Sequence, residues 1–139
     1  MTNLTFTMIK PDAVRAGNEA AILLHLKRAG FRIVALRMHQ LSREDAERFY
    51  AVHKGKPFYE GLVEFMTSGP IVAAVLEKEN AVAELRKTVG ATNPEQAEEG
   101  TVRRLYGTSV QQNAIHASDS DENAAIEWAI HFDEKDIFA

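Results

Sequence analysis

The chain has 139 residues, 45% of them hydrophobic, which suits one compact domain with its own core. The absence of cysteine excludes disulfides and thiolate metal sites, and the net charge of −4 argues against general nucleic-acid binding, which requires a basic face. No apolar run approaches the roughly 20 residues that span a bilayer. We therefore expect a single cytoplasmic domain, residues 1–139, with no membrane partner and no specific nucleic-acid partner.

Apolar periodicity predicts an α/β (α+β) domain. Expected strands cover residues 4–9, 31–38, 71–76 and about 128–132, and expected helices cover residues 19–29, 42–53, 62–66, 80–86 and about 120–127. The first strand alternates apolar side chains with Thr5 and Thr7, so we expect it to be buried on one face only. This order of elements predicts a ferredoxin-like, four-stranded antiparallel sheet covered by helices, which we expect on one face.

Polar residues mark where several of the helices begin. Ser42 forms a weak capping-box pattern with Asp45, and Asn80 is placed to cap the helix that follows it. For the last helix the pattern leaves two alternatives open, either Ser118 with Asp119 or Ser120 with Asp121.

Residues 88–112 show no periodic pattern. Glycine and proline interrupt the segment repeatedly, and Arg103 and Arg104 lie near its middle. A loop of this length is unusual in a compact domain and is usually functional. We therefore expect it to contribute to a site rather than to the core.

Two other segments could face a ligand. Lys10 follows the first strand, and ligands often bind where strands end, although a solvated lysine is the commoner case there. The turn K-G-K-P-F-Y, residues 54–59, could stack a base, or it could be a surface turn with one aromatic tucked inward.

The standard nucleotide, zinc-protease and serine-hydrolase motifs are absent, and the histidines lack metal-ligand spacing. His116 remains as a nucleophile candidate, within N-A-I-H-A-S-D just before a predicted helix start. A helix N-terminus favours anions and a neutral imidazole, and a neutral imidazole can accept a phosphoryl group covalently. The alternative is a polar loop residue without a catalytic role.

Resemblance to a known family decides between these readings. The motifs that carry it are T-M-I-K-P-D-A-V (7–14), A-G-F-R-I-V-A-L (29–36), F-Y-A-V-H-K (49–54), S-G-P-I-V-A-A-V-L-E (68–77), G-A-T-N-P (90–94), E-G-T-V-R (99–103) and N-A-I-H-A-S-D-S (113–120), with Glu127. In this order, over nearly the whole length, they resemble the nucleoside diphosphate kinases.

The resemblance implies a role for each matched residue. His116 would accept the phosphate, and Glu127 would hold the other ring nitrogen. The remaining matches are Lys10, Arg86, Thr92 and Arg103 around the phosphates, Tyr50 close to the histidine and the transferred phosphate, Ser118 beside the histidine, Asn113 at the sugar hydroxyl, and Phe58 under the base.

The family resemblance also implies the reaction. The γ-phosphate of a nucleoside triphosphate, mainly ATP, would pass through a phosphohistidine on His116 to a nucleoside diphosphate, in a ping-pong reaction that maintains nucleoside triphosphate pools. Mg²⁺ would be carried by the nucleotide phosphates rather than by protein ligands, and the long loop would cover the nucleotide. The enzyme would discriminate little between bases, because an aromatic ring stacks on the face of a base and does not contact its hydrogen-bonding edge. Relatives form hexamers, tetramers or dimers, so we expect a homo-oligomer.

Two alternatives stay open at this point. The chain could be an inactive relative or a ferredoxin-like module that binds nucleotide or nucleic acid, or it could have a regulatory protein-histidine kinase role. Among departures from the family pattern, Ala117 replaces a glycine directly after the predicted nucleophile, and Lys56 replaces a frequent arginine. A Cβ at Ala117 removes access to positive φ, so either the backbone does not need that conformation or His116 is displaced.

Overall fold

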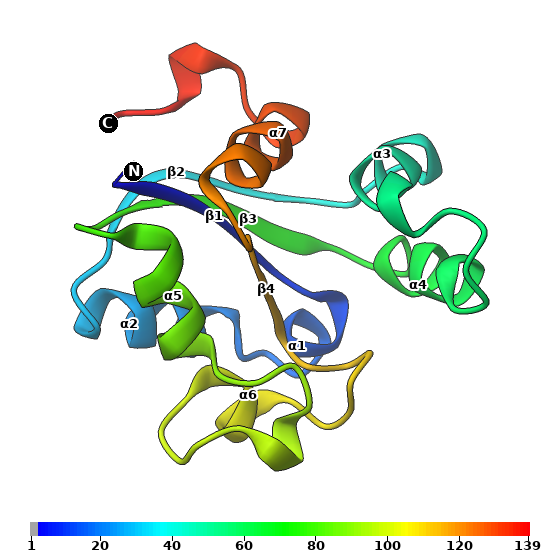
Figure 1. Cartoon of the computed structure of the whole chain (residues 1–139), viewed down its shortest axis with the longest axis horizontal. Coiled ribbons are helices and arrows are strands. Elements are labelled where there is room, and N and C mark those ends of the chain that lie inside the picture. Colours follow the sequence, from blue (N-terminus) through cyan, green and yellow to red (C-terminus); the bar gives the residue numbers. More distant parts are fainter. Residues whose placement is uncertain (1–2) are drawn as a thin grey trace.

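The computed structural model describes residues 3–139 (Figure 1). The strands are β1 (Leu4–Ile9), β2 (Arg32–His39), β3 (Ile71–Glu77) and β4 (Ile115–Ala117). The helices are α1 (Pro11–Arg15), α2 (Glu19–Arg28), α3 (Arg43–Phe49), α4 (Tyr59–Met66), α5 (Ala81–Val89), α6 (Val102–Tyr106) and α7 (Asp121–His131), with 3₁₀ turns η1 (Ala51–His53), η2 (Pro94–Gln96) and η3 (Glu134–Asp136).

The strands form one four-stranded antiparallel sheet in the order β2-β3-β1-β4. The predicted ferredoxin-like class is confirmed. β1 pairs with β3 from Leu4 opposite Glu77 to Ile9 opposite Val72, and on its other side Met8 lies opposite His116 of β4. Because Lys10 directly follows β1, this register places the predicted nucleophile close to the predicted phosphate-binding lysine.

The prediction of the fourth strand was wrong. Residues 128–131 continue α7, whereas the fourth strand is the three-residue segment Ile115–Ala117. Three residues are too few to show the alternating pattern of a strand, and this segment is extended because it pairs with the edge of β1. The bulky residues near the end of α7 suggested a strand, but Trp128 and Ile130 pack against the core from a helix.

Helices cover both faces of the sheet, so the prediction of one covered face was also wrong. One cluster of core side chains joins the sheet to α3, α4 and α7, and another joins it to α1, α2, α5 and α6 (Figure 1). β1 is therefore buried on both faces, and Thr5 and Thr7 are fully buried rather than solvated. The Thr7 hydroxyl donates to the carbonyl of His116 at 2.7 Å, which allows this polar residue inside the sheet.

The long segment after α5 is partly structured. It contains η2 and the five-residue helix α6, which begins where the Thr101 side chain accepts a hydrogen bond from the Arg104 N–H. Val102 is fully buried in the second core cluster and ties the segment to the domain. The sequence pattern missed α6 because one turn and a half is too short for a helical period.

Two of the three predicted helix caps are confirmed. Ser42 accepts from the Asp45 N–H at 3.1 Å, and of the two alternatives for the last helix it is Ser120 that accepts from the Asn123 N–H at 3.1 Å. Asn80 makes no side-chain cap and instead adopts a left-handed conformation, φ 57°, which asparagine tolerates well.

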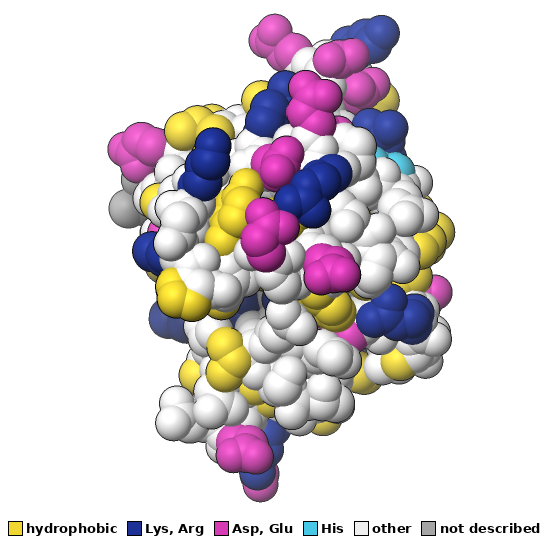
Figure 2. Space-filling view, turned by 90° about the vertical axis from the view of Figure 1, so that its right-hand side faces the viewer, with side chains coloured by type: hydrophobic (Ala, Val, Ile, Leu, Met, Phe, Trp, Pro, Cys, Tyr) yellow, Lys and Arg dark blue, Asp and Glu magenta, His cyan; other side chains and the backbone are white. Residues whose placement is uncertain are grey.

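Acidic and basic side chains are interspersed on the face that α3 and α4 present (Figure 2). Arg43 of α3, for example, pairs with Glu47 and Glu60, and Arg48 pairs with Asp45. Within residues 3–139, no helix combines the length and apolar character needed to cross a membrane.

We expect His131 to make the fold acid-sensitive. His131 is buried, stacks on Phe6 and shares a hydrogen bond with His39. Burial lowers the pKa of His131 to about 4; the nearby charges of His39 and Arg37 add to this shift, and Asp45 opposes it. The unfolded chain therefore binds this proton at a higher pH than the folded chain, and stability falls as the pH drops from about 6.5 to about 4. Between pH 7 and pH 4.5, the free energy of unfolding should therefore fall by roughly 2–3 kcal/mol less in His131→Gln than in wild type.

Urea unfolding at fixed protein concentration measures this difference. His25→Gln, on the outward part of α2, is the matched control and should keep the wild-type pH dependence. An unchanged pH dependence in His131→Gln would contradict the prediction.

Candidate active site around His116

A cavity of about 900 Å³ opens between the α3–α4 side of the domain and the segment that contains α6. Nine of the predicted site residues line it: Lys10, Tyr50, Phe58, Arg86, Thr92, Arg103, Asn113, His116 and Glu127. Ser118 is fully buried beside it and does not line it. The fold thus brings together residues from six separate segments of the sequence.

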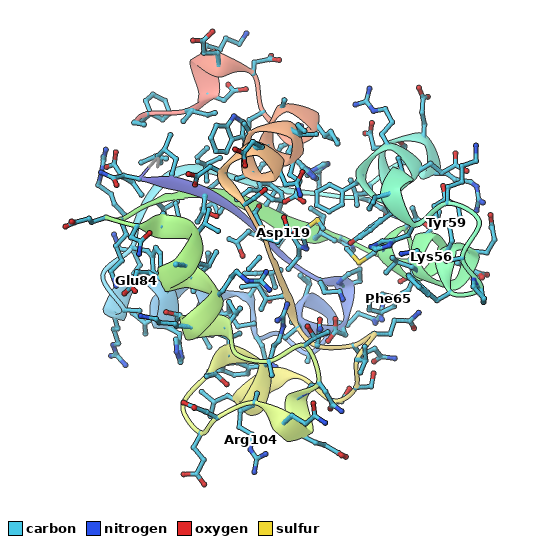
Figure 3. The ribbon with its side chains drawn as sticks, in the orientation of Figure 1. Lys56, Tyr59, Phe65, Glu84, Arg104 and Asp119 are labelled. Carbon is cyan, nitrogen blue, oxygen red and sulfur yellow. The ribbon has the colours of Figure 1, made fainter. Side chains whose placement is uncertain are left out.

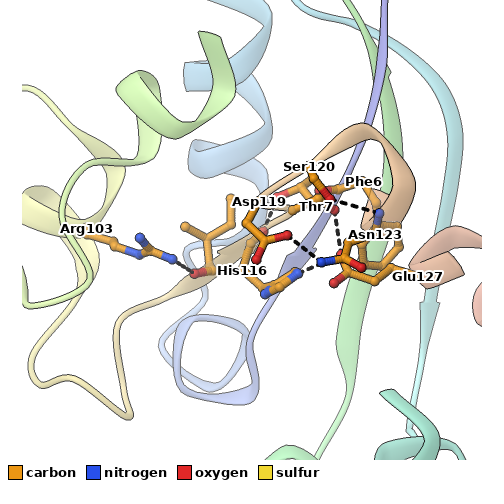
Figure 4. Close-up of polar contacts among 10 residues, drawn as sticks. Phe6, Thr7, Arg103, His116, Asp119, Ser120, Asn123 and Glu127 are labelled. Carbon is orange, nitrogen blue, oxygen red and sulfur yellow. Dashed lines mark hydrogen bonds and ion pairs between the residues drawn. The ribbon is translucent and has the colours of Figure 1, made fainter. Parts of the chain in front are cut away.

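His116 is held at one ring nitrogen only (Figure 4). Its Nε2 lies 2.9 Å from Glu127 Oε1, and the Ser118 hydroxyl donates to the same carboxylate oxygen at 2.5 Å. Nδ1 makes no hydrogen bond with any described residue. With Glu127 as a carboxylate, Nε2 carries the proton and Nδ1 has the free lone pair, so the geometry fixes the tautomer of a nucleophilic imidazole.

The position of His116 differs from the predicted one. His116 lies within β4, not directly at the start of α7, and its backbone is fixed by pairing with Met8. Glu127 on α7, and not a helix N-terminus, therefore determines which ring nitrogen faces a hydrogen-bond partner. The imidazole also packs edge-on to Phe49, with ring centroids 5.1 Å apart, and this contact restricts its rotation.

Ala117 needs no glycine-like backbone. Among the described non-glycine residues only Asn80 and Ala114 have positive φ, and Ala117 lies in the extended strand β4. Of the two alternatives left open by the sequence, the structure supports the one in which the backbone does not need positive φ.

Lys10 is buried at the end of β1 and points into the cavity. Its Nζ donates to the Gln111 carbonyl at 2.8 Å and to Asn113 Oδ1 at 3.0 Å. Burial lowers the pKa of Lys10 to about 8; the charge of Asp12 opposes this shift and that of Arg103 adds to it. The Phe65 ring, which lies between α4 and α1 in Figure 3, has its centroid 5.7 Å from Nζ. Lys10 is a desolvated cation that an anion in the cavity would stabilise.

Arg103 is a second, partly buried cation of the cavity. Its guanidinium donates to the carbonyls of Gly90 and Ile115, both at 2.9 Å, while its Nε is buried without a partner among the described residues. Burial, and then repulsion from Arg86, lower the pKa of Arg103 to about 10. The guanidinium therefore stays charged at neutral pH, with Arg86 on the exposed side of the same cavity.

Asn113 links the cation pair to the loop. Its Oδ1 accepts from Lys10, and its Nδ2 donates to the Thr92 carbonyl at 3.0 Å. Tyr50 closes the other side of the cavity, packed edge-on to Phe49 with ring centroids 4.9 Å apart. Burial, with the negative charge of Glu127, raises the pKa of Tyr50, so its hydroxyl keeps its proton near neutral pH.

An apolar end of the cavity lies away from these cations. The Phe58 ring is 51% exposed, with His53 5.2 Å and Lys56 Nζ 5.8 Å from its centroid. Exposed aliphatic side chains also line the cavity, Val110 from the loop and Ile126 from α7. The sequence reasoning missed Val110 and Ile126, because a single exposed aliphatic residue carries no pattern.

Other lining residues were also missed. Asp119, Asn123 and Arg48 contribute polar groups to the cavity, and Asp119 accepts from the Asn123 amide at 2.7 Å (Figure 4). The S-D-S pattern could have indicated Asp119, which was considered only as a helix cap. Within the described residues, no three His, Cys, Asp or Glu side chains gather as a metal site would require.

A family model for nucleoside diphosphate kinases matches residues 3–137. The chain belongs to this family. A nucleoside diphosphate kinase from Flavobacterium psychrophilum is 56% identical over 137 residues, with 99% of both chains covered. Another, from Persephonella marina, is 53% identical over 133 residues, covering 96% of this chain and 95% of that protein.

Solved structures agree with the sequence comparison. The Aquifex aeolicus nucleoside diphosphate kinase superposes with a TM-score of 0.95 at 42% identity, covering 99% of both chains. A Halobacterium salinarum nucleoside diphosphate kinase in complex with CDP gives a TM-score of 0.95 at 36% identity, covering all of this chain and 93% of that one. The chain is an enzyme, a phosphotransferase that moves the γ-phosphate of a nucleoside triphosphate to a nucleoside diphosphate in ping-pong fashion through a phosphohistidine.

The pKa of Lys10 predicts how nucleotide affinity depends on pH. In the free enzyme the ammonium loses its proton above about pH 8, whereas bound phosphates favour the charged form. Binding above that pH therefore requires proton uptake, and the Kd for ADP at pH 9 should be about tenfold weaker than at pH 7.

Calorimetric titration in two buffers of different ionisation enthalpy would measure both the affinity and the proton uptake. Lys10→Gln should bind ADP more weakly than wild type at pH 7, and its Kd should no longer change between pH 7 and pH 9. An affinity that is equally pH-dependent in both proteins would contradict the assignment to Lys10.

Proposed function

We propose that His116 is the residue that carries the phosphoryl group, with Nδ1 as the attacking atom. The observation that supports this most directly is the bond between Nε2 and Glu127 Oε1, which leaves the Nδ1 lone pair free in a cavity lined by cations. The Nδ1–P bond forms as the bond between the γ-phosphorus and the bridging oxygen breaks, and the nucleoside diphosphate leaves with that electron pair. A second nucleoside diphosphate then takes the phosphoryl group by the reverse step.

Glu127 and Ser118 support the nucleophile in this proposal. As Nδ1 gives up its lone pair, positive charge spreads over the imidazole ring, and the carboxylate beside Nε2–H stabilises it. The Ser118 hydroxyl donates to that same oxygen and so fixes the rotamer of Glu127. Tyr50, protonated and packed on Phe49, would donate its hydroxyl toward the transferred phosphate.

The phosphates would bind among Lys10, Arg86, Arg103 and Thr92. Lys10 and Arg103 are buried enough that burial lowers their pKa values, so phosphate oxygens would regain part of the free energy that their desolvation costs. Arg86 and Thr92 are exposed in the free enzyme and can close on the phosphates without breaking a buried contact. This arrangement stabilises the charge of phosphoryl transfer by positioning rather than by covalent chemistry.

Phe58 would stack the base, and Asn113 would bind the sugar hydroxyl. Because a ring face does not distinguish bases by hydrogen bonding, ATP and other nucleoside tri- and diphosphates would all be substrates. The bound CDP named for the Halobacterium salinarum structure is compatible with a pyrimidine nucleotide in this cavity.

Mg²⁺ would enter on the nucleotide. Glu127 is engaged by His116 and Ser118, and within residues 3–139 no three acidic or histidine side chains gather as a metal cage. This donor set fits an ion held by phosphate oxygens, and Asp119, whose Oδ1 accepts from Asn123, is a further carboxylate on the cavity wall. When bound, Mg²⁺ neutralises part of the phosphate charge.

We further propose that residues 1–139 form one catalytic domain, that segment 88–112 covers the nucleotide, and that the enzyme works as a cytoplasmic homo-oligomer. The first proposal is supported by the family match over residues 3–137. The second is supported by Thr92, Arg103 and Val110, which all reach the cavity from that segment.

His116→Ala is expected to abolish the phosphoenzyme without unfolding the protein, because the side chain is on a cavity wall. The measurement is intact mass after brief exposure to ATP and Mg²⁺, followed by addition of a different nucleoside diphosphate. Wild type should gain one acid-labile phosphate and lose it to the second nucleotide. His53→Ala, a second histidine of the same cavity, is the control and should still be phosphorylated; turnover retained by His116→Ala would refute the assignment.

Glu127→Gln is expected to slow phosphorylation of His116 by roughly 10- to 100-fold, because the amide can accept from Nε2–H but no longer offers a negative charge to the ring. Nucleotide affinity should change little, since the phosphate-binding groups remain. Single-turnover quenched-flow experiments separate the two effects. Glu122→Gln, exposed in the first turn of the same helix, is the matched control.

A further inference from the structure

The backbone between Asn113 and Ile115 forms a strained turn. Ala114 has φ 74° and is fully buried, and the Ile115 N–H donates to the Asn113 carbonyl at 2.9 Å. A three-residue turn closed this way with positive φ is rare, and a non-glycine residue persists in it only where the surroundings impose it. The turn lies between Asn113, which binds Lys10, and the strand that carries His116.

The surroundings that impose this turn come from the junction of β1 and α1. The Ala114 carbonyl accepts from the Lys10 N–H at 2.8 Å, and the Ala114 N–H donates to Asp12 Oδ2 at 3.1 Å. Both polar groups of Ala114 are thus held by residues of a distant segment, with Asp12 102 positions away in the sequence. Asp12 supplies the only side chain in this clamp among the described residues.

A carboxylate is a costly choice for a purely structural clamp. Asp12 is partly buried, and its Oδ1 is buried with no hydrogen-bond partner among the described residues. Burial raises the pKa of Asp12, while the charge of Lys10 and the N–H groups of Ala114, Asp12 and Ala13 lower it. An asparagine could accept the same N–H group without the desolvation of a charge, so the charge itself needs an explanation.

Lys10 provides that explanation. Its ammonium is desolvated and repelled by Arg103, and the negative charge of Asp12 is the attraction that opposes both effects. Asp12 itself is not among the residues that line the cavity, so it has no direct contact with the space where the phosphates would bind.

We propose that Asp12 is a positioning residue for phosphoryl transfer: it holds the strained Ala114 turn between Asn113 and His116, and it places a negative charge at the same turn that Lys10 binds through its backbone N–H. The proposal rests on the role proposed above for Lys10. It assigns to one carboxylate both the geometry of the turn and the negative charge beside it.

Asp12→Asn tests the charge. The side chain keeps its shape and its acceptor for the Ala114 N–H, so thermal stability should stay close to wild type. The pH at which ADP affinity begins to fall should move down by about half a unit or more, because Lys10 loses its nearby negative charge. Glu79→Gln is the charge-matched control, exposed in the turn after β3 at the opposite end of β1 from Lys10, and should not move it.

Two results of this experiment are distinguishable. If Lys10→Gln removes the pH dependence and Asp12→Asn does not shift it, the Asp12 proposal is overturned while the role of Lys10 stands. If Lys10→Gln leaves the pH dependence intact, the role of Lys10 falls, and the Asp12 proposal falls with it.

Asp12→Ala combined with Ala114→Gly tests the turn. Glycine adopts positive φ without strain, so the turn should depend less on Asp12 when residue 114 is glycine. In the wild-type background, Asp12→Ala should slow single-turnover phosphorylation of His116 by roughly tenfold or more. In the Ala114→Gly background, the factor by which Asp12→Ala slows the reaction should be smaller by at least about threefold. Equal slowing in the two backgrounds would overturn the clamp, and Asp12→Asn keeps the charge testable if Asp12→Ala fails to fold.

Discussion

The pairing of β1 with β4 is the interaction on which the site depends. β1 is an inner strand, fixed on one side by β3, and its other edge pairs with the three-residue strand that carries His116. The Thr7 hydroxyl reinforces this pairing through the His116 carbonyl. Because Lys10 and Asp12 follow β1 directly, the same register sets the distances between the His116 ring, the buried ammonium and the Asn113–Ile115 turn.

The site concentrates desolvated charge that the fold does not neutralise internally. Burial lowers the pKa values of Lys10 and Arg103; repulsion from Arg103 lowers that of Lys10 further, and repulsion from Arg86 lowers that of Arg103. Such an arrangement costs stability in the free protein and favours a polyanionic ligand, which supplies the missing counter-charge. The carboxylate Glu127 is on the opposite ring edge of His116, where it acts on the imidazole without occupying the phosphate side. Glu127 thereby engages Nε2 of His116 and leaves Nδ1 without a hydrogen bond among the described residues.

The layered arrangement explains how a polar site can be held so firmly. Helices on both faces bury β1 from Thr5 to Ile9, so Lys10 follows a strand end that is shielded from water. The cavity then opens at the strand ends, where α3, α4 and the segment containing α6 extend beyond the sheet (Figure 1). The long segment 88–112 lies on this side and contributes Thr92, Arg103 and Val110 to the cavity wall.

The sequence by itself determined three of the four strands, most of the helices and, through its resemblance to the family, nine of the residues that line the cavity. Long apolar patterns and local caps such as Ser42 depend on neighbours in the chain, so they are readable from it. Only the tertiary structure decided that the last strand is Ile115–Ala117, that both faces of the sheet are covered, and that Asp12 clamps Ala114. Each of these depends on contacts between distant segments: a short strand exists only beside its partner, and a buried carboxylate acquires its role only from the groups that folding brings to it.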